Sequence, residues 1–146
     1  MMKVKQERTG WRDEALSNRH REWGWDCPML DIDFIGLEYD SGKPTAIVEY
    51  KNENAQPQYP SHPSYRALAK LGTLAGLPVF ACRYASDFSK WQVTPLNSVA
   101  TLKTGRAEMT EVEWVEFLYG LRGRHVPAQV VSKLTQSQHI KNNVIH

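Results

Sequence analysis

The chain has 146 residues, a length that fits one domain with an ordinary hydrophobic core. Hydrophobic residues make up 41% of it and charged residues 23%, a balance that excludes a disordered chain. The formal net charge of +2 permits nucleic-acid binding through local patches, but it does not by itself argue for such binding.

The sequence predicts a cytoplasmic protein. No apolar run approaches the roughly 18 residues of a membrane span, and the N-terminus lacks the apolar segment of a signal peptide. Two cysteines, Cys27 and Cys82, form neither a disulfide framework nor a zinc set. We expect both to be buried thiols, which suits a reducing compartment.

The N-terminal part is predicted to be a flexible segment followed by a helix. Residues 1–9 are polar and are expected to be flexible. Apolar side chains recur at near-helical spacing over residues 10–23, which predicts a helix there. Its second half is rich in basic groups, and two interpretations stay open: a solvated face, or a surface on which Arg19, His20 and Arg21 bind phosphates.

Two strands joined by a turn are predicted next, over about residues 29–39 and 45–51. The turn between them contains Gly42, which can take positive φ, and Pro44, which cannot donate to a strand ladder. Side chains alternate between the two faces of a strand. Alternation predicts that Tyr50 points into the core.

The same alternation gathers charged groups on the opposite face, which carries Asp31, Asp33, Glu49 and Lys51 beside aliphatic side chains. A face washed by solvent would not need the aliphatic neighbours, so we expect the acids at the rim of a cleft. Clustered carboxylates repel one another, and at least one should have a raised pKa. The alternative interpretation is an exposed cross-strand salt-bridge set, which would stabilise the protein only slightly.

Helix and strand signals follow in the middle of the chain. After a polar loop over residues 52–60, a helix is predicted to begin at a Ser61 or Ser64 cap and to end near Ala75, with Gly76 as its C-terminal cap. A largely buried strand over residues 77–84 follows. A strand–helix–strand connection of this kind favours a parallel crossover.

The C-terminal third carries weaker signals. Residues 91–96 predict another strand, placed at the sheet edge because of Pro95. Residues 97–108 are expected to form a loop. Thr110 and the glutamate three residues later predict a capping box that begins a helix ending at Gly123. The tail, residues 124–146, is expected to be mobile, with at most a short helix at its start.

The pattern of Asp33 followed by Glu49-Tyr50-Lys51 resembles the PD-(D/E)XK nuclease superfamily, which has the restriction-endonuclease-like fold. The resemblance covers about residues 11–84. It implies an α/β domain over residues 10–123, with a central mixed sheet of four or five strands flanked by helices. No proline directly precedes Asp33, which departs from the literal motif.

The resemblance also implies a reaction and its groups. Asp33, Glu49 and the Tyr50 carbonyl would bind Mg²⁺ or Mn²⁺, and Lys51 would position a water and stabilise negative charge in the hydrolysis of a phosphodiester. The first helix often adds a glutamate in this superfamily. Glu14 is the candidate here, with Glu22 second. Asp31 is expected either to support the site from beside it or to be a surface acid.

Partners follow from the same resemblance. The expected substrate is nucleic acid, with DNA favoured over RNA and Arg66 and Lys70 sharing the phosphate contacts with the first helix. The chain is too small to hold a separate target-recognition domain, which favours a structure-selective enzyme, a homodimer or a part of a larger complex. The alternative function is a non-catalytic nucleic-acid-binding or assembly module on the same fold.

Overall fold

The structure, a computed structural model, describes residues 14–24 and 26–144. The chain divides into two compact units, Met1–Asp31 and Ile32–His146. The segment predicted to be flexible, residues 1–9, lies outside the described residues. Within these residues, no helix combines the length and apolar character needed to cross a membrane.

The first unit contributes helix α1, Glu14–Glu22, inside the range predicted for it. None of its nine residues is buried. Arg19 and Glu22 form an exposed ion pair at 3.7 Å, one turn apart. The exposure of Arg19 and Arg21 fits a solvated face and leaves both accessible to a partner, whereas His20 is half-buried against the ring of Trp23.

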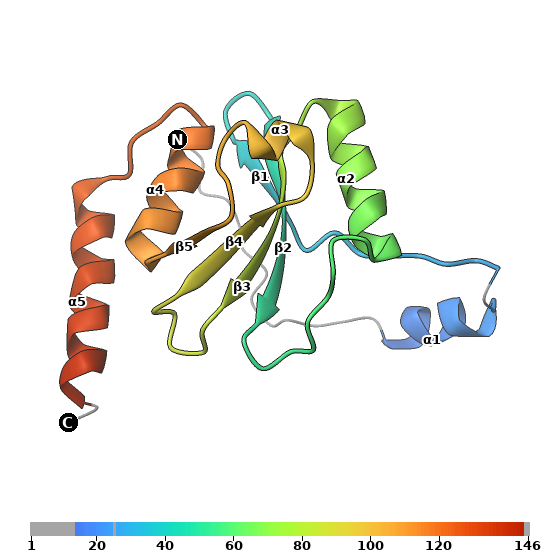
Figure 1. The fold of residues 1–146 in the computed structure, drawn as a ribbon, viewed down its shortest axis with the longest axis horizontal. Helices are drawn as coiled ribbons and strands as arrows, with labels where there is room; N and C mark the ends of the chain where they lie inside the picture. Colours follow the sequence, from blue (N-terminus) through green and yellow to red (C-terminus); the bar gives the residue numbers. More distant parts are fainter. Residues whose placement is uncertain (1–13, 25, 145–146) are drawn as a thin grey trace. The chain divides into compact units, whose positions relative to one another are not determined.

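The second unit contains a five-stranded mixed sheet with strand order β1-β2-β3-β4-β5 (Figure 1). β2 and β3 are parallel, and the other neighbouring pairs are antiparallel. The predicted parallel crossover through a helix is therefore confirmed. The strands are β1 (Phe34–Glu38), β2 (Lys43–Asn52), β3 (Val79–Tyr84), β4 (Trp91–Pro95) and β5 (Ala107–Met109).

Helices cover both faces of this sheet, as Figure 1 shows. They are α2 (Pro63–Ala75), the short α3 (Ser98–Thr101) and α4 (Glu111–Leu121), and α5 (Ala128–Val144) lies beside α4. Trp114 of α4 packs with Val48 and Phe80 on one face. Leu68 of α2 packs with Ile47 and Val79 on the other. The predicted α/β class is confirmed.

β1 is shorter than the strand predicted over residues 29–39, and that prediction is wrong for residues 29–33. The strand begins at Phe34, opposite Val48 of β2. One residue earlier, Asp33 bonds to β2 through side chains instead of through a backbone ladder: its N–H donates to the Glu49 carboxylate, and its own carboxylate accepts from the Tyr50 N–H. These side-chain bonds take the place of backbone ladder bonds, so the strand does not extend to residues before Phe34.

The two ends of α2 differ in how well the sequence predicts them. His62, and neither predicted serine, is the N-cap, and its Nδ1 accepts from the Ser64 N–H at 3.2 Å. Histidine is missing from the usual set of capping residues, which explains the error. Gly76 does form the C-cap, with φ of 71°, a conformation that favours glycine.

β4 is not the sheet edge, so the prediction drawn from Pro95 is wrong. Pro95 is the last residue of β4, and β5 pairs only with the first three residues of that strand. The missing N–H of the proline is therefore never required on the β5 side. The expected loop over residues 97–108 contains both α3 and β5.

The C-terminal segment forms a continuous helix, α5, of 17 residues, where at most a short helix was expected. It follows α4, whose predicted capping box is confirmed and whose end, Leu121, comes just before Gly123. Between the two helices, Arg122 and Arg124 hold Glu38 at 3.2 and 2.9 Å and tie this segment to β1. Of the two cysteines predicted to be buried, Cys82 is buried and Cys27 is exposed.

Candidate active site

Asp33 and Glu49 meet where β1 begins and β2 nears its end. β1 and β2 are antiparallel, so the first residues of one strand lie beside the last residues of the other. Because Phe34 pairs with Val48, the chain places Asp33 opposite Glu49 and on the same face. Glu49 is 9% exposed, whereas Asp33 is exposed.

Two hydrogen bonds hold the carboxylates in place. The Asp33 N–H donates to Glu49 Oε1 at 2.9 Å, and the Tyr50 N–H donates to Asp33 Oδ2 at 3.2 Å. Each of these bonds engages one oxygen of a carboxylate, and the two carboxyl groups also interact with each other. The two acids are thus held side by side, where one ligand can reach both.

The pKa of Glu49 is raised, as the clustering of acids predicts. Burial is the largest cause, and the charge of Asp33 and a bond to its carboxyl group raise it further. The bond from the Asp33 N–H and the charge of Lys51 act in the opposite direction. A partly buried acid beside a second acid binds a proton or a cation more readily than an ordinary surface acid does.

The interpretation as an exposed salt-bridge set is wrong. Glu49 is nearly buried, and no ion pair within the described part of the chain includes Lys51. Both carboxylates accept from backbone N–H groups, Glu49 from that of Asp33 and Asp33 from that of Tyr50, instead of contacting a base. The site therefore keeps the carboxylates together at the cost of mutual repulsion, which a simple cross-strand ion pair would avoid.

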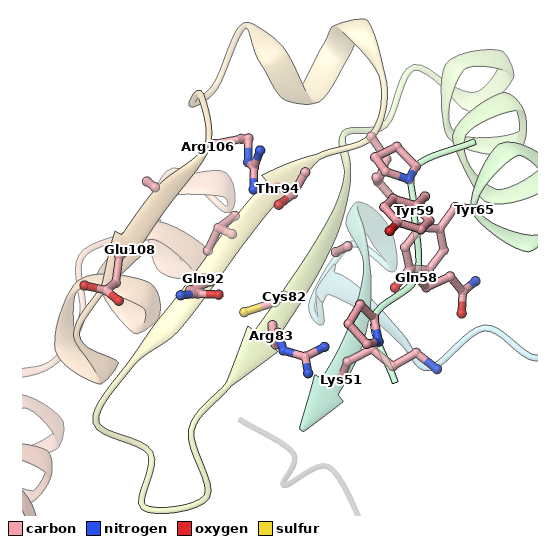
Figure 2. A pocket seen from close by; sticks show the side chains of 16 residues that line it. Lys51, Gln58, Tyr59, Tyr65, Cys82, Arg83, Gln92, Thr94, Arg106 and Glu108 are labelled. Carbon is pink, nitrogen blue, oxygen red and sulfur yellow. The ribbon is translucent and has the colours of Figure 1, made fainter. Parts of the chain in front are cut away.

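Lys51 is the first of four polar side chains that lie side by side across the exposed part of this face. It pairs with Arg83 of β3, which pairs with Gln92 of β4, which pairs with Glu108 of β5. Paired residues share a face, so the row forms the floor of a groove of about 590 Å³ (Figure 2). The carboxylate pair lies next to this groove, because Glu49 precedes Lys51 by two residues on the same face.

Tyr65 of α2 lines the same groove and is not among the site residues that the sequence predicts. The residue is 4% exposed, and burial raises the pKa of its hydroxyl. The charges of Glu49 and Asp33 raise that pKa further, and Arg83 lowers it. The phenol therefore lies within the electric field of both acids.

Arg83 is also absent from the site residues that the sequence predicts, because the strand over residues 77–84 is predicted to be largely buried. Its Nη2 donates to the carbonyl oxygens of Glu53 and Ala55 at 2.5 and 2.6 Å. These bonds fix the start of the loop that follows β2. A charged residue within an otherwise apolar strand indicates a polar site, and this could have drawn attention to Arg83. Aligning the two parallel strands would then have placed it opposite Lys51.

The other predicted site residues are not joined to the carboxylates by the structure. Arg66 and Lys70 are exposed on α2 and do not line the groove. The remaining five belong to the first unit, and their parts in the site stay predictions: Glu14, Arg19, His20, Arg21 and the exposed Asp31.

The site contains two acids, not a larger cluster. Within the described residues, no three His, Cys, Asp or Glu side chains converge as a set that could hold a metal ion. Mg²⁺ is commonly bound by one or two carboxylates together with water and substrate phosphate. Asp33 and Glu49 fit that requirement for a single ion.

No protein-family model, curated protein or solved structure matches the chain. What the chain does is therefore inferred from the chemistry of the groove and the two acids.

Proposed function

We propose that the chain is a metal-dependent nuclease that hydrolyses nucleic-acid phosphodiesters, with a restriction-endonuclease-like core. The observation that carries the proposal is the pair of acids, Asp33 and Glu49, held together with a raised Glu49 pKa beside a basic groove. The position of Asp33 directly before β1, with Glu49 and Lys51 on the adjacent β2, supports the resemblance to the PD-(D/E)XK superfamily.

The acids suit Mg²⁺ or Mn²⁺, and the Tyr50 carbonyl is the proposed third ligand. A bound divalent cation would supply Lewis acidity and a water of lowered pKa. Asp33 and Glu49 would bind that cation through the carboxylate oxygens that accept no backbone N–H. A second ion would need a further acid, for which Glu14 stays the candidate.

The remaining groups act on the substrate. Lys51, at the mouth of the groove, would orient the attacking water and stabilise the charge that develops on the phosphate. Arg83 holds the loop after β2 and keeps the groove open beside Lys51. Tyr65 offers a protonated hydroxyl to the same region, because the neighbouring acids disfavour its ionised form.

A cleavage assay tests the proposal. Wild-type protein and Asp33→Asn would be incubated with single-stranded, duplex and branched DNA and with RNA, each with Mg²⁺, Mn²⁺ or chelator. We expect cleavage that requires the cation and is lost in Asp33→Asn. The matched control is Asp40→Asn, which changes an exposed acid in the β1–β2 turn and should cleave like the wild type.

The second candidate is a non-catalytic nucleic-acid-binding module. The basic groove favours it, because Lys51, Arg83 and Arg106 line the groove against one acid, Glu108, whether or not a cation binds. Binding of nucleic acid without cleavage under any condition of the panel would favour this module over the nuclease. DNA remains the favoured partner in both cases.

A further inference from the structure

Tyr59 presents an aromatic ring on one side of the groove. The side chain is 75% exposed, and within the described part of the chain no other ring contacts it. Its loop is nevertheless held to α2: the Tyr59 carbonyl accepts from the His62 N–H at 2.9 Å, and Gln58 Nε2 donates to Ser64 Oγ at 2.8 Å. A ring on a fixed loop loses little entropy when a ligand stacks on it.

Basic side chains line other parts of the groove. In Figure 2, Arg106 lies across the groove from Tyr59, and Lys51 and Arg83 lie at the end where β2 and β3 terminate. Three cations and one acid, Glu108, leave a positive lining. Positive groups facing a free aromatic ring form the combination that binds single strands, since phosphates meet the cations while bases stack on the ring.

From this arrangement we infer that the groove binds an unpaired strand of nucleic acid, with a base on Tyr59 and backbone phosphates on Lys51 and Arg106. The inference rests on the proposed function and names its substrate class. A duplex offers its phosphates but hides the faces of its bases within the stack, so Tyr59 can discriminate between the two forms.

Fluorescence anisotropy of a labelled oligothymidylate in chelator measures strand binding without cleavage. Unlabelled oligothymidylate and a long blunt duplex are added as competitors at equal nucleotide concentration. We expect Tyr59→Ala to weaken binding about 5- to 150-fold, the effect of losing one stacked base. Tyr59→Phe keeps the ring and should bind like the wild type. Tyr39→Ala removes an exposed tyrosine in the β1–β2 turn and should also leave affinity unchanged.

Salt dependence tests the phosphate contacts separately. Arg106→Gln should flatten the slope of log affinity against log salt by about 0.7, the value for one phosphate of a single strand. Lys103→Gln is the matched control, because Lys103 is exposed nearby and does not line the groove. A slope unchanged in Arg106→Gln refutes its phosphate contact.

The inference is overturned if the duplex competes as well as the single strand, or if Tyr59→Ala binds as tightly as the wild type. Metal-dependent cleavage together with either result would leave the nuclease proposal standing and refute strand selection. Strand binding that depends on Tyr59 without any cleavage would support the inference and refute the nuclease. An oligouridylate in place of oligothymidylate separates RNA from DNA.

Discussion

Replacing Glu49 separates the two roles that the structure gives to its carboxylate. Glu49→Gln keeps an oxygen that can accept from the Asp33 N–H, now at 2.9 Å, and removes only the charge. Glu49→Ala removes the charge and the acceptor. The two variants therefore differ by the hydrogen bond, worth about 1 kcal/mol, and by the packing of the side-chain atoms that alanine lacks. For a unit of this size, the hydrogen bond alone corresponds to a difference in melting temperature of about 4 °C.

The charge itself should destabilise the protein when no cation is bound. Because the folded-state pKa of Glu49 is raised, its favourable contribution is complete below the ordinary glutamate pKa and is lost as pH rises through the raised value. At slightly alkaline pH in chelator, Glu49→Gln should thus melt above the wild type. Its melting temperature should also depend less on pH in the weakly acidic range.

A bound divalent cation should instead make the wild type melt above Glu49→Gln. At a concentration 100 times its Kd, a ligand stabilises the folded state by about 2.7 kcal/mol, which here means a rise of about 10 °C. We expect millimolar Mn²⁺ to produce such a rise in the wild type and little in Glu49→Gln. Thermal melts in Mn²⁺ and in chelator measure both effects. A wild type that melts above Glu49→Gln in chelator would refute the reasoning.

Three further predictions concern the rest of the molecule. The Tyr50 hydroxyl accepts from the Nε1–H of Trp114 at 3.0 Å, and Trp114 is 2% exposed. Tyr50→Phe removes this acceptor and should lower the free energy of unfolding, measured in urea, by about 1–3 kcal/mol. An unchanged free energy would contradict this. The two arginines that hold Glu38 lower the pKa of its carboxyl group, so its contribution to stability is present above the ordinary glutamate pKa and is lost as pH falls through the lowered value. Thermal melts from neutral to strongly acidic pH should therefore show a smaller loss in Glu38→Gln than in the wild type. Neutralising the basic residues 19–21 of α1 should weaken DNA binding and flatten its salt dependence, whereas a purely solvated face predicts no change in either.

Local sequence signals predict those parts of the fold that local chemistry decides. Alternation along residues 45–51 places Glu49 and Lys51 on one face and Tyr50 on the other, and the structure confirms this through the contact of Tyr50 with Trp114. The capping box at Thr110 needs only two side chains three residues apart, and it is confirmed. The raised pKa of Glu49 follows from the same strand pairing.

The errors have non-local causes. The start of β1 at Phe34 depends on side-chain bonds between Asp33 and the residues Glu49 and Tyr50, which lie 16 and 17 residues further along the chain. β5 has only three residues and gains its partner from β4, so its own sequence carries little signal. Arg83 and Tyr65 join the site only through the crossover that sets β3 and α2 beside β2.

The central claim is that Asp33, Glu49 and Lys51 form a catalytic site, and Lys51→Ala tests it most directly. If the acids bind the cation and Lys51 acts on the transition state, as proposed, Lys51→Ala should show unchanged or stronger stabilisation by Mn²⁺ and only slightly weaker substrate binding. Cleavage under single-turnover conditions should fall by about 10²–10³, the usual cost of one electrostatic stabiliser. Cleavage by Lys51→Ala at the rate of the wild type would contradict the assignment.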